Sequence, residues 1–399
     1  LAMSVRHGNG QAVWFDGRVG PRYDRIRALA VAPGGRHYAY IAQKGERSVV
    51  VRDGCESPAY DEALAWSLNY SPGGRRLTYL AHRNLRFFAV IDGHEGRGYD
   101  VLVSEKVQFS PNGWRCAYAA RRDGMWYMVI DGHESPAYDG LGLPVFSPDS
   151  EHVAYRARRG DVVFAVVDGQ ECDPYLDLHS VSFSPDTQRL AYAARVGDKW
   201  TLVRNGTRSG QYQYIAPDSL SYSSDGLHCA FAAKISGRWH PVADDEVGPA
   251  YDAVEQTAIN SEGRLAYVAR EGGRAVAVIG GARSREYADI AGLRYSPDGS
   301  RHAYRASLSI PPEQPTQQMV IDGEAGPVCE WVRPAVFSPD GRHVAYLARV
   351  NGRTQLIVDG EKRLTFTWVP PTDPAFDDEG NLFYVGARFC GIQRVMVAQ

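Results

Sequence analysis

One aromatic residue recurs along the whole chain, at the end of an Ala-Tyr or similar pair, and its spacing constrains the fold more than any other feature. Successive copies are separated by 36 to 42 positions. A period of this size, sustained over a full chain, is typical of repeat architectures in which each copy is one unit of supersecondary structure. We expect the aromatic rings to pack between neighbouring repeats. The ten positions are Tyr40, Tyr79, Tyr118, Tyr155, Tyr192, Phe231, Tyr267, Tyr304, Tyr346 and Tyr384.

Each copy is predicted to form four antiparallel β-strands. A short apolar segment meets a Ser-Pro-Asp-Gly type turn, as at residues 338–341, where Pro presets φ and Gly accepts a positive φ. The second segment, such as residues 343–348, alternates apolar and polar side chains as a half-buried strand does. The third, such as residues 356–358, ends in Asp-Gly, which between two β segments predicts a type I′ hairpin. A fourth segment follows and is marked by a Tyr-Asp pair.

The two dipeptide signals recur with the aromatic ladder. The Asp-Gly step occurs at Asp16, Asp53, Asp92, Asp131, Asp168, Asp322 and Asp359, with Asn205-Gly206 and Gly280-Gly281 as equivalents. The Tyr-Asp pair begins at Tyr23, Tyr60, Tyr99, Tyr138 and Tyr251, with looser versions at Tyr175, Tyr214 and Tyr287. Four-stranded meanders repeated at this period are the blades of a β-propeller, where stacking buries the faces that one blade leaves exposed. We therefore predict an all-β fold, a single β-propeller domain over residues 1–399 with about ten four-stranded antiparallel blades.

The two ends of the chain leave the number of blades open. Residues 1–6, 12–17 and 23–24 read as second, third and fourth strands, and residues 375–399 read as first, second and third strands. We expect N-terminal strands to complete the last blade, which leaves one spare hairpin. It can lie over an edge, belong to an incomplete eleventh blade, or pair with a neighbouring molecule. Two five-bladed rings are a further alternative, and an open solenoid is disfavoured because the ends do not read as polar caps. Residues 307–318 read as a protruding loop.

Charge and composition exclude several classes of function. The 44 basic and 47 acidic residues are interspersed and give a net charge of -3, whereas a nucleic-acid or anionic-membrane footprint needs a basic stripe. No apolar run is long enough to span a bilayer, so we predict no membrane span. Residues 1–6 resemble the interior of a repeat, so we expect no signal peptide within this chain. The compartment stays open, with an extracytoplasmic (periplasmic or secreted) location favoured over a cytoplasmic one. The six cysteines, which form no CxxC motif, are predicted to be separate thiols: Cys55, Cys116, Cys172, Cys229, Cys329 and Cys390.

The repeated polar residues are better explained by structure than by chemistry. Asp131 and Asp139 are eight positions apart with Pro and apolar residues between them, so we favour turn, capping and pairing roles over a calcium loop. Four histidines precede the aromatic ladder by three residues, and we expect them to be solvent-facing strand residues on separate sheets: His37, His152, His228 and His343. First-strand residues are small or polar and predict a wide, polar channel: Asn69, Gln108, Ser182 and Ser221. We predict no catalytic, cofactor-binding or metal-ligating residue, and no cofactor.

The pattern Phe-Ser-Pro-Asp-Gly-x-x-x-Ala-Tyr at residues 337–346, repeated through the chain, resembles the bacterial WD-repeat-like family found in the propeller of TolB and in propellers of the prolyl oligopeptidase family. The resemblance implies a propeller that binds proteins or gates an attached domain. A serine hydrolase domain would need a Gly-x-Ser-x-Gly elbow, which the sequence lacks.

These observations lead to two hypotheses of function. The first is a non-enzymatic scaffold for protein-protein interaction or structural assembly, which also self-associates through unmatched terminal strands. Its partner is then a protein or a second copy of the chain, and not nucleic acid. The alternative is a propeller that binds or cleaves a small molecule or glycan at the mouth of its channel.

Overall fold

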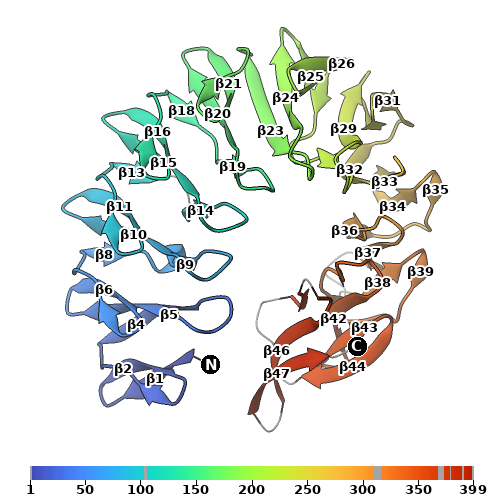
Figure 1. Cartoon of the computed structure of the whole chain (residues 1–399). Helices are drawn as coiled ribbons and strands as arrows, with labels where there is room; N and C mark the ends of the chain where they lie inside the picture. The colour runs from blue at the N-terminus through green and yellow to red at the C-terminus, as the bar shows by residue number, and fades with distance from the viewer. Residues whose placement is uncertain are drawn as a thin grey trace. The chain divides into compact units, whose positions relative to one another are not determined.

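The computed structural model describes residues 2–102, 106–309, 316–366, 373–377, 379–388 and 391–397, with main-chain description only for 384–388 and 391–397. Within these residues the structure is β-strand and turn, apart from one short 3-10 helix, η1 (Ala65–Ser67). The chain divides into two compact units, Leu1–Phe183 and Ser184–Gln399, and each is described by itself. In Figure 1 the strands of the first unit run in chain order from blue to green.

Unit 1 is built around antiparallel hairpins of a second and a third strand. These are β1 (Ala2–His7) with β2 (Gly10–Phe15), β5 (Tyr38–Lys44) with β6 (Arg47–Arg52), β10 (Leu77–Arg83) with β11 (Arg86–Ile91), β15 (Cys116–Arg122) with β16 (Met125–Ile130), and β20 (Val153–Arg159) with β21 (Val162–Val167). The first strands are β4 (Arg25–Val31), β8 (Glu62–Ala63) and β9 (Asn69–Tyr70), β13 (Val101–Leu102) and β14 (Gln108–Phe109), β18 (Gly140–Leu141) and β19 (Val145–Phe146), and β23 (Asp177–Phe183). The fourth strands are β3 (Arg18–Val19), β7 (Cys55–Glu56), β12 (His94–Glu95), β17 (His133–Glu134) and β22 (Gln170–Glu171).

Unit 2 is also built around antiparallel hairpins of a second and a third strand. They are β24 (Leu190–Val196) with β25 (Lys199–Arg204), β29 (Cys229–Ile235) with β30 (Arg238–Ala243), β33 (Leu265–Glu271) with β34 (Arg274–Ile279), β37 (His302–Ser307) with β38 (Gln317–Ile321), β42 (Val344–Val350) with β43 (Arg353–Val358), and β46 (Leu382–Arg388) with β47 (Gly391–Val397). First strands are β27 (Tyr214–Ile215) and β28 (Ser221–Tyr222), β32 (Ala253–Ile259), β36 (Asp289–Tyr295), β40 (Trp331–Val332) and β41 (Val336–Phe337), and β45 (Ala375–Phe376). Fourth strands are β26 (Thr207–Tyr212), β31 (Glu246–Val247), β35 (Ala282–Arg283), β39 (Glu324–Ala325) and β44 (Glu361–Phe366).

The hairpins between third and fourth strands follow directly from the Asp-Gly steps. Asp131 has φ 51° and Gly132 has φ 86°, the two positive values that a type I′ turn needs. Asn205-Gly206 and Gly280-Gly281 also have positive φ at both residues. The prediction of type I′ hairpins is therefore confirmed. The sequence signal missed one turn, at Asp244-Asp245, because an Asp with φ 72° stands where the other copies have Gly.

The first and fourth strands differ from the predicted regular meander. In several blades the first strand is broken: β13 pairs with the end of β15, whereas β14 pairs with its beginning. The fourth strand was expected to carry the Tyr-Asp pair, and this expectation is corrected. Strand β17 comprises only the two residues after the Asp-Gly turn, and Tyr138 forms a separate bridge to Trp126. Beyond these two residues the chain still bonds to the third strand at single points, from Ser135 to Met128 and between Tyr138 and Trp126.

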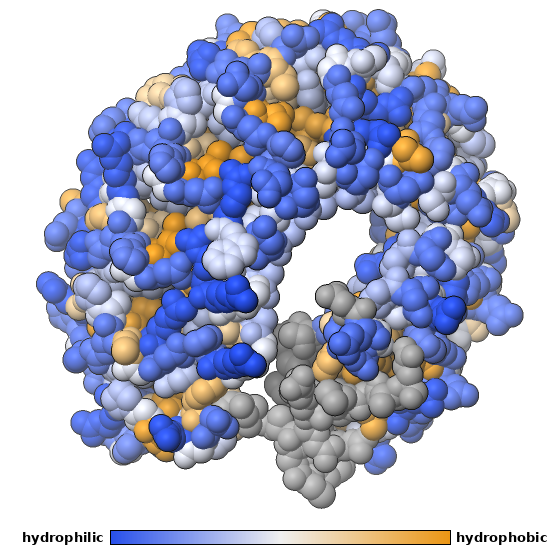
Figure 2. All heavy atoms as spheres, viewed as in Figure 1, coloured by the Kyte–Doolittle hydropathy of each residue, from blue (hydrophilic) through white to orange (hydrophobic). Residues whose placement is uncertain are grey.

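The hydrophobic core lies between neighbouring sheets and not within one. In unit 1 one cluster joins Met128 and Tyr138 of one blade with Tyr155 and Val166 of the next. Nine of the ten aromatic positions of the ladder are buried, with at most 5% of their surface exposed, as predicted; the side chain of Tyr384 lies outside the described part. On the face shown in Figure 2, hydrophilic side chains cover most of the surface and hydrophobic ones form patches among them.

The predicted fold class is confirmed: the chain is all-β and has the antiparallel blades of a β-propeller. The number of blades, their closure and the single domain stay predictions. The insertion at 307–318 does lie between a second and a third strand, β37 and β38, although residues 310–315 fall outside the described part. Five cysteines are free thiols, and Cys390 lies outside that part. No helix in the described residues is long and apolar enough to cross a membrane.

Candidate functional site

The Asp of each Asp-Gly turn also ties its hairpin to the start of the second strand. Asp168 accepts a hydrogen bond from the backbone N–H of Val153 at 3.0 Å, and its other oxygen lies 2.6 Å from Nδ1 of His152. The four predicted histidines all make this contact, with partners Asp53, Asp168, Asp244 and Asp359. They lie one residue before the second strand and clamp the turn, which corrects their assignment as simple solvent-facing strand residues. In other blades an Arg takes the place of the His, as in the Arg115–Asp131 pair at 2.9 Å.

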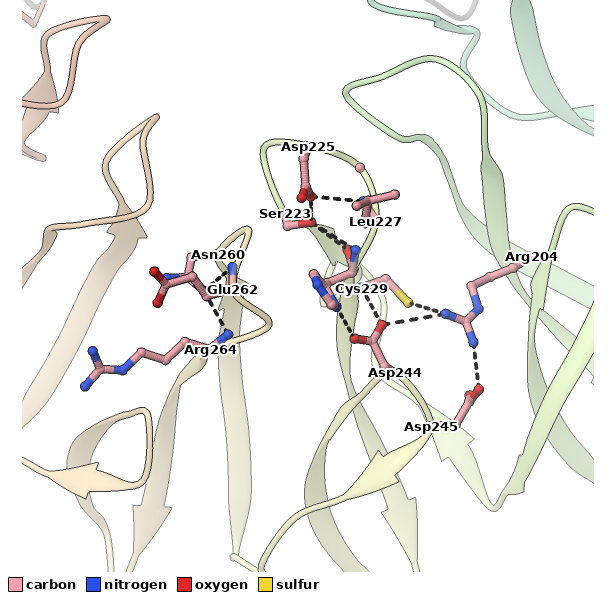
Figure 3. A network of polar contacts seen from close by, with 12 residues as sticks. Arg204, Ser223, Asp225, Leu227, Cys229, Asp244, Asp245, Asn260, Glu262 and Arg264 are labelled. Carbon is pink, nitrogen blue, oxygen red and sulfur yellow. Dashed lines mark hydrogen bonds and ion pairs between the residues drawn. The ribbon is translucent and has the colours of Figure 1, made fainter.

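Figure 3 shows how one such network in unit 2 is extended. Asp244 accepts from the backbone N–H of Cys229, and Asp245 occupies the position of the usual Gly. Arg204 of β25 reaches both: it lies 3.7 Å from Asp244 and 2.6 Å from Asp245, and it donates to Sγ of Cys229 at 3.4 Å. The ion pair with Arg204 holds Asp245 in the left-handed backbone region, which residues other than Gly rarely adopt.

The Tyr-Asp pair serves two blades. Tyr138 bonds back to Trp126 of its own blade, whereas the backbone N–H of Asp139 donates to Arg158 of the next blade. The carboxylate of Asp139 accepts from the backbone N–H of Gly160 at 2.7 Å and so caps the turn between β20 and β21. Asp131 and Asp139 therefore serve different turns, as the structural interpretation expected. In the described residues no three His, Cys, Asp or Glu side chains form a group that could hold a metal ion.

A Tyr-Glu-Arg triad, in which Tyr99 is buried and Glu134 and Arg122 are half-buried, locks neighbouring blades of unit 1. The hydroxyl of Tyr99 donates to Oε1 of Glu134, in the next blade, at 2.7 Å. Arg122 donates to both oxygens of Glu134, at 2.5 and 3.1 Å, and its guanidinium lies over the ring of Tyr99. The bonds from Arg122, helped by Tyr99, lower the pKa of Glu134 to about 2. Equivalent locks join Tyr138 to Glu171 with Arg159, and Tyr23 to Glu56 with Lys44.

Beside the Glu134 lock, the β10 blade (β8–β12) and the β15 blade (β13–β17) enclose an open cleft of about 1020 Å³, here called the Trp114 cleft. Its walls are two Asp-Gly hairpins, residues 92–95 and 131–134. Buried Cys116, Tyr99 and Tyr118 form its base, and Trp114 and Arg97 lie at its rim. This volume is at the upper end of the range found for ligand pockets.

Trp114 is the most unusual residue of the Trp114 cleft. It is 59% exposed although its backbone is fixed on both sides: its N–H donates to Asn112 at 3.0 Å, and its carbonyl accepts from Arg76 at 2.5 Å. The guanidinium of Arg75 lies 5.4 Å from the centre of the indole ring, and Arg75 does not line the cleft. A large aromatic side chain is thus held in place at the edge of a cleft and remains accessible there.

The thiol in the base is poorly suited to nucleophilic chemistry. Cys116 is 1% exposed, and burial raises its pKa to about 11. The thiolate is the reactive form of cysteine, so this group is protonated at neutral pH.

Unit 2 contains a cleft at the equivalent position, here called the His302 cleft. It lies between the blade of β33 and β34 and that of β37 and β38, and its volume is about 550 Å³. In the repeat alignment Arg285 matches Arg97, His302 matches Cys116 and Ala325 matches Glu134. Ser300, which does not line this cleft, stands where the first has Trp114.

Sequence reasoning named no residue of the Trp114 cleft as a site. A signal was present, because Trp114 stands in a turn where other copies carry Arg75, Glu151 or Leu227. The polar first-strand residues predicted to line a channel lie in or beside first strands and are half-buried or exposed. None of these four residues lines the Trp114 cleft.

Known proteins resemble this chain in structure at low sequence identity. No family model and no curated protein matches the sequence. Among solved structures, the chain is similar to the crystal structure of a eukaryotic initiation factor, with TM-score 0.45, 10% identity, and 91% of this chain and 94% of that chain covered. It is also similar to TolB from Acinetobacter baumannii (TM-score 0.31, 12% identity, 65% and 78% covered). A third similar structure is the β-propeller domain of the Trilobed protease from Pyrococcus furiosus (TM-score 0.33, 13% identity, 65% and 94% covered).

Proposed function

We propose that this protein is a non-enzymatic β-propeller scaffold of the bacterial TolB-like type that binds a segment of a protein partner in the Trp114 cleft. The observation that carries the proposal is Trp114 itself, exposed and fixed at the rim of the cleft described in unit 1. Protein interfaces concentrate their binding free energy in Trp, Tyr and Arg, which are the large side chains of this cleft.

The state of the polar groups supports binding in preference to catalysis. A general acid or base must be free to exchange a proton with a substrate. Glu134 is held by Arg122 and Tyr99, and Asp131 by Arg115 and a backbone N–H. These carboxylates shape the cleft as parts of fixed ion pairs.

The test is a selection of random 12-residue peptides on the immobilised full chain, followed by titration of the selected peptides by fluorescence anisotropy. We expect Trp114→Ala to weaken binding by about 10- to 100-fold, as loss of a central aromatic anchor does. Trp66→Ala is the matched control, because Trp66 is 52% exposed and does not line the Trp114 cleft. Equal effects of the two substitutions, or no selectable peptide, would contradict the proposal. Titration with soluble oligosaccharides tests the alternative of a glycan ligand.

Self-association is the second candidate function, and one observation favours it. Strand β1 is the edge strand of its sheet and pairs on one side only, with β2, among the described residues. An open edge is a template for a strand of another molecule. We expect light scattering to show oligomers that grow with protein concentration, and a strict monomer at high concentration would exclude this mode.

A further inference from the structure

The carboxylates of the Trp114 cleft all accept hydrogen bonds within the protein, and Glu134 accepts the most. Glu134 accepts two hydrogen bonds from Arg122, one from Tyr99 and one from Arg97 at 2.9 Å. Glu95 is held through both oxygens by Arg83, at 3.0 and 2.6 Å. A carboxylate has about four lone-pair sites, so Glu134 is saturated.

The two aspartates also accept hydrogen bonds, Asp92 three and Asp131 two. Asp92 accepts from Arg76 at 2.8 Å, from a backbone N–H and from Arg52. Asp131 accepts from Arg115 at 2.9 Å and from a backbone N–H at 2.8 Å. Around Glu134 itself two arginines share one carboxylate, because Arg97 and Arg122 both donate to it.

Donors, by contrast, remain free at the rim. Arg97 is 67% exposed and bonds to Glu134 through one of its five N–H groups. His94 and His133 are exposed and line the cleft, and neither has a side-chain partner in the described part of the chain. The indole N–H of Trp114 adds a further donor beside them. These unused donors, with the charged guanidinium of Arg97 among them, favour an acceptor-rich ligand that carries a negative charge.

The size of the cleft and Trp114 exclude a small free anion as the fitting occupant. A single carboxylate on Arg97 would leave most of the 1020 Å³ and the exposed indole in water. A segment of a protein chain can fill the cleft and also cover the indole of Trp114, because it places a carboxylate beside an apolar or aromatic side chain. Such a side chain gains from burial against the Trp114 ring.

Resting on the proposed function, we infer that the Trp114 cleft takes an acidic segment of a protein partner, in which Asp or Glu bonds to Arg97 and a neighbouring aromatic residue packs on Trp114. Arg97 is suited to this role because it is dispensable for the lock: Arg122 and Tyr99 hold Glu134 without it. Arg97 therefore determines which ligand binds, whereas the lock between the blades does not depend on it.

The test uses the full chain and two fluorescein-labelled pools of 12-residue peptides with random flanks, one with a central Glu-Phe-Glu and one with Gln-Phe-Gln. We expect the acidic pool to bind about tenfold more tightly, since a hydrogen bond to a charged group is stronger than a neutral one. Arg97→Gln should weaken the acidic pool by about 5- to 20-fold and leave the Gln pool unchanged. Arg285→Gln, at the matched position of the His302 cleft, should change neither.

Every other outcome would overturn either the acidic preference or the proposed function. Equal binding of the two pools through Trp114 would overturn the acidic preference while the proposed function stands. The acidic preference is also overturned if Arg97→Gln and Arg285→Gln change the binding of the acidic pool equally. Competition by citrate or polygalacturonate as effective as that of the acidic pool would assign the site to a non-protein anion. If neither pool binds and the peptide selection also yields nothing that depends on Trp114, the proposed function fails as well.

Discussion

The Trp114 cleft and the His302 cleft occupy the same place in their blades, and they differ mainly in what holds their walls together. In the first, Glu134 joins Tyr99 of one blade to Arg122 of the next. In the second, Tyr287 has Arg285 over its ring at 5.0 Å and accepts from Gln318 at 3.3 Å. The same backbone therefore supports an ion-paired lock between blades in one cleft and a neutral Gln–Tyr hydrogen bond between blades in the other. The larger, locked cleft is the one that also displays Trp114.

The largest effect is expected from removal of the lock. Glu134→Ala leaves Arg122 and Tyr99 without their shared acceptor in a site where Glu134 is only 17% exposed. We expect a loss of about 2–4 kcal/mol in the free energy of unfolding, measured by urea denaturation. Glu324→Ala, an exposed position in unit 2, is the control and should change this quantity by less than about 0.5 kcal/mol. Similar losses for both variants would remove the distinction between the clefts.

Acid should weaken the Trp114 cleft in a defined pH window. The folded-state pKa of Glu134, about 2, lies below its ordinary value of 4.5, so its contribution to stability is present above pH 4.5 and is lost as the pH falls toward 2. We expect Glu134→Gln to lose less stability than the wild type between pH 5 and pH 2, in urea denaturation at a series of pH values. Parallel curves would show that the lock does not depend on the charge of Glu134.

The His302 cleft should respond to acid at higher pH and more weakly. Burial lowers the pKa of His302, although Asp322 opposes this shift. The unfolded chain then binds the proton more readily than the folded chain, so stability falls as the pH drops below the ordinary histidine range near 6.5. His302→Gln should remove this slope between pH 7 and pH 5. A slope that persists in the variant would have to come from groups other than His302.

The smallest effect on stability is expected from moving the aromatic residue. Ser300→Trp places an indole at the matched turn of unit 2, where Ser300 is exposed and bonds to Asp298. We expect a change within about 0.5 kcal/mol, measured by urea denaturation, because exposed substitutions of this kind are nearly neutral. In peptide titrations this variant should gain no more than a few-fold in affinity, since the His302 cleft has about half the volume. An affinity equal to that of the Trp114 cleft would show that the indole alone suffices for peptide binding.

Local features were predictable from the sequence because neighbouring residues determine them. Asp131-Gly132 specifies its turn through the φ values that the two residues tolerate. The burial of the Tyr ladder followed from strict periodicity. The lock was not predictable, because Tyr99 and Glu134 are 35 positions apart and nothing in either copy indicates which Glu is reached. Asp245 was missed for a different reason: Arg204, forty-one positions earlier, stabilises a conformation that the local sequence disfavours.

The division of the Tyr-Asp pair between two blades has a consequence for synthesis. Tyr99 closes one blade but donates to Glu134 of the next, and Asp100 caps the turn of that next blade through the N–H of Asp123. The β10 blade thus cannot reach its final set of bonds when its own last residue leaves the ribosome. It waits for one further repeat, which at 5–20 residues per second is a delay of about 2–8 seconds. During translation this blade is therefore completed only after the following repeat has been synthesised.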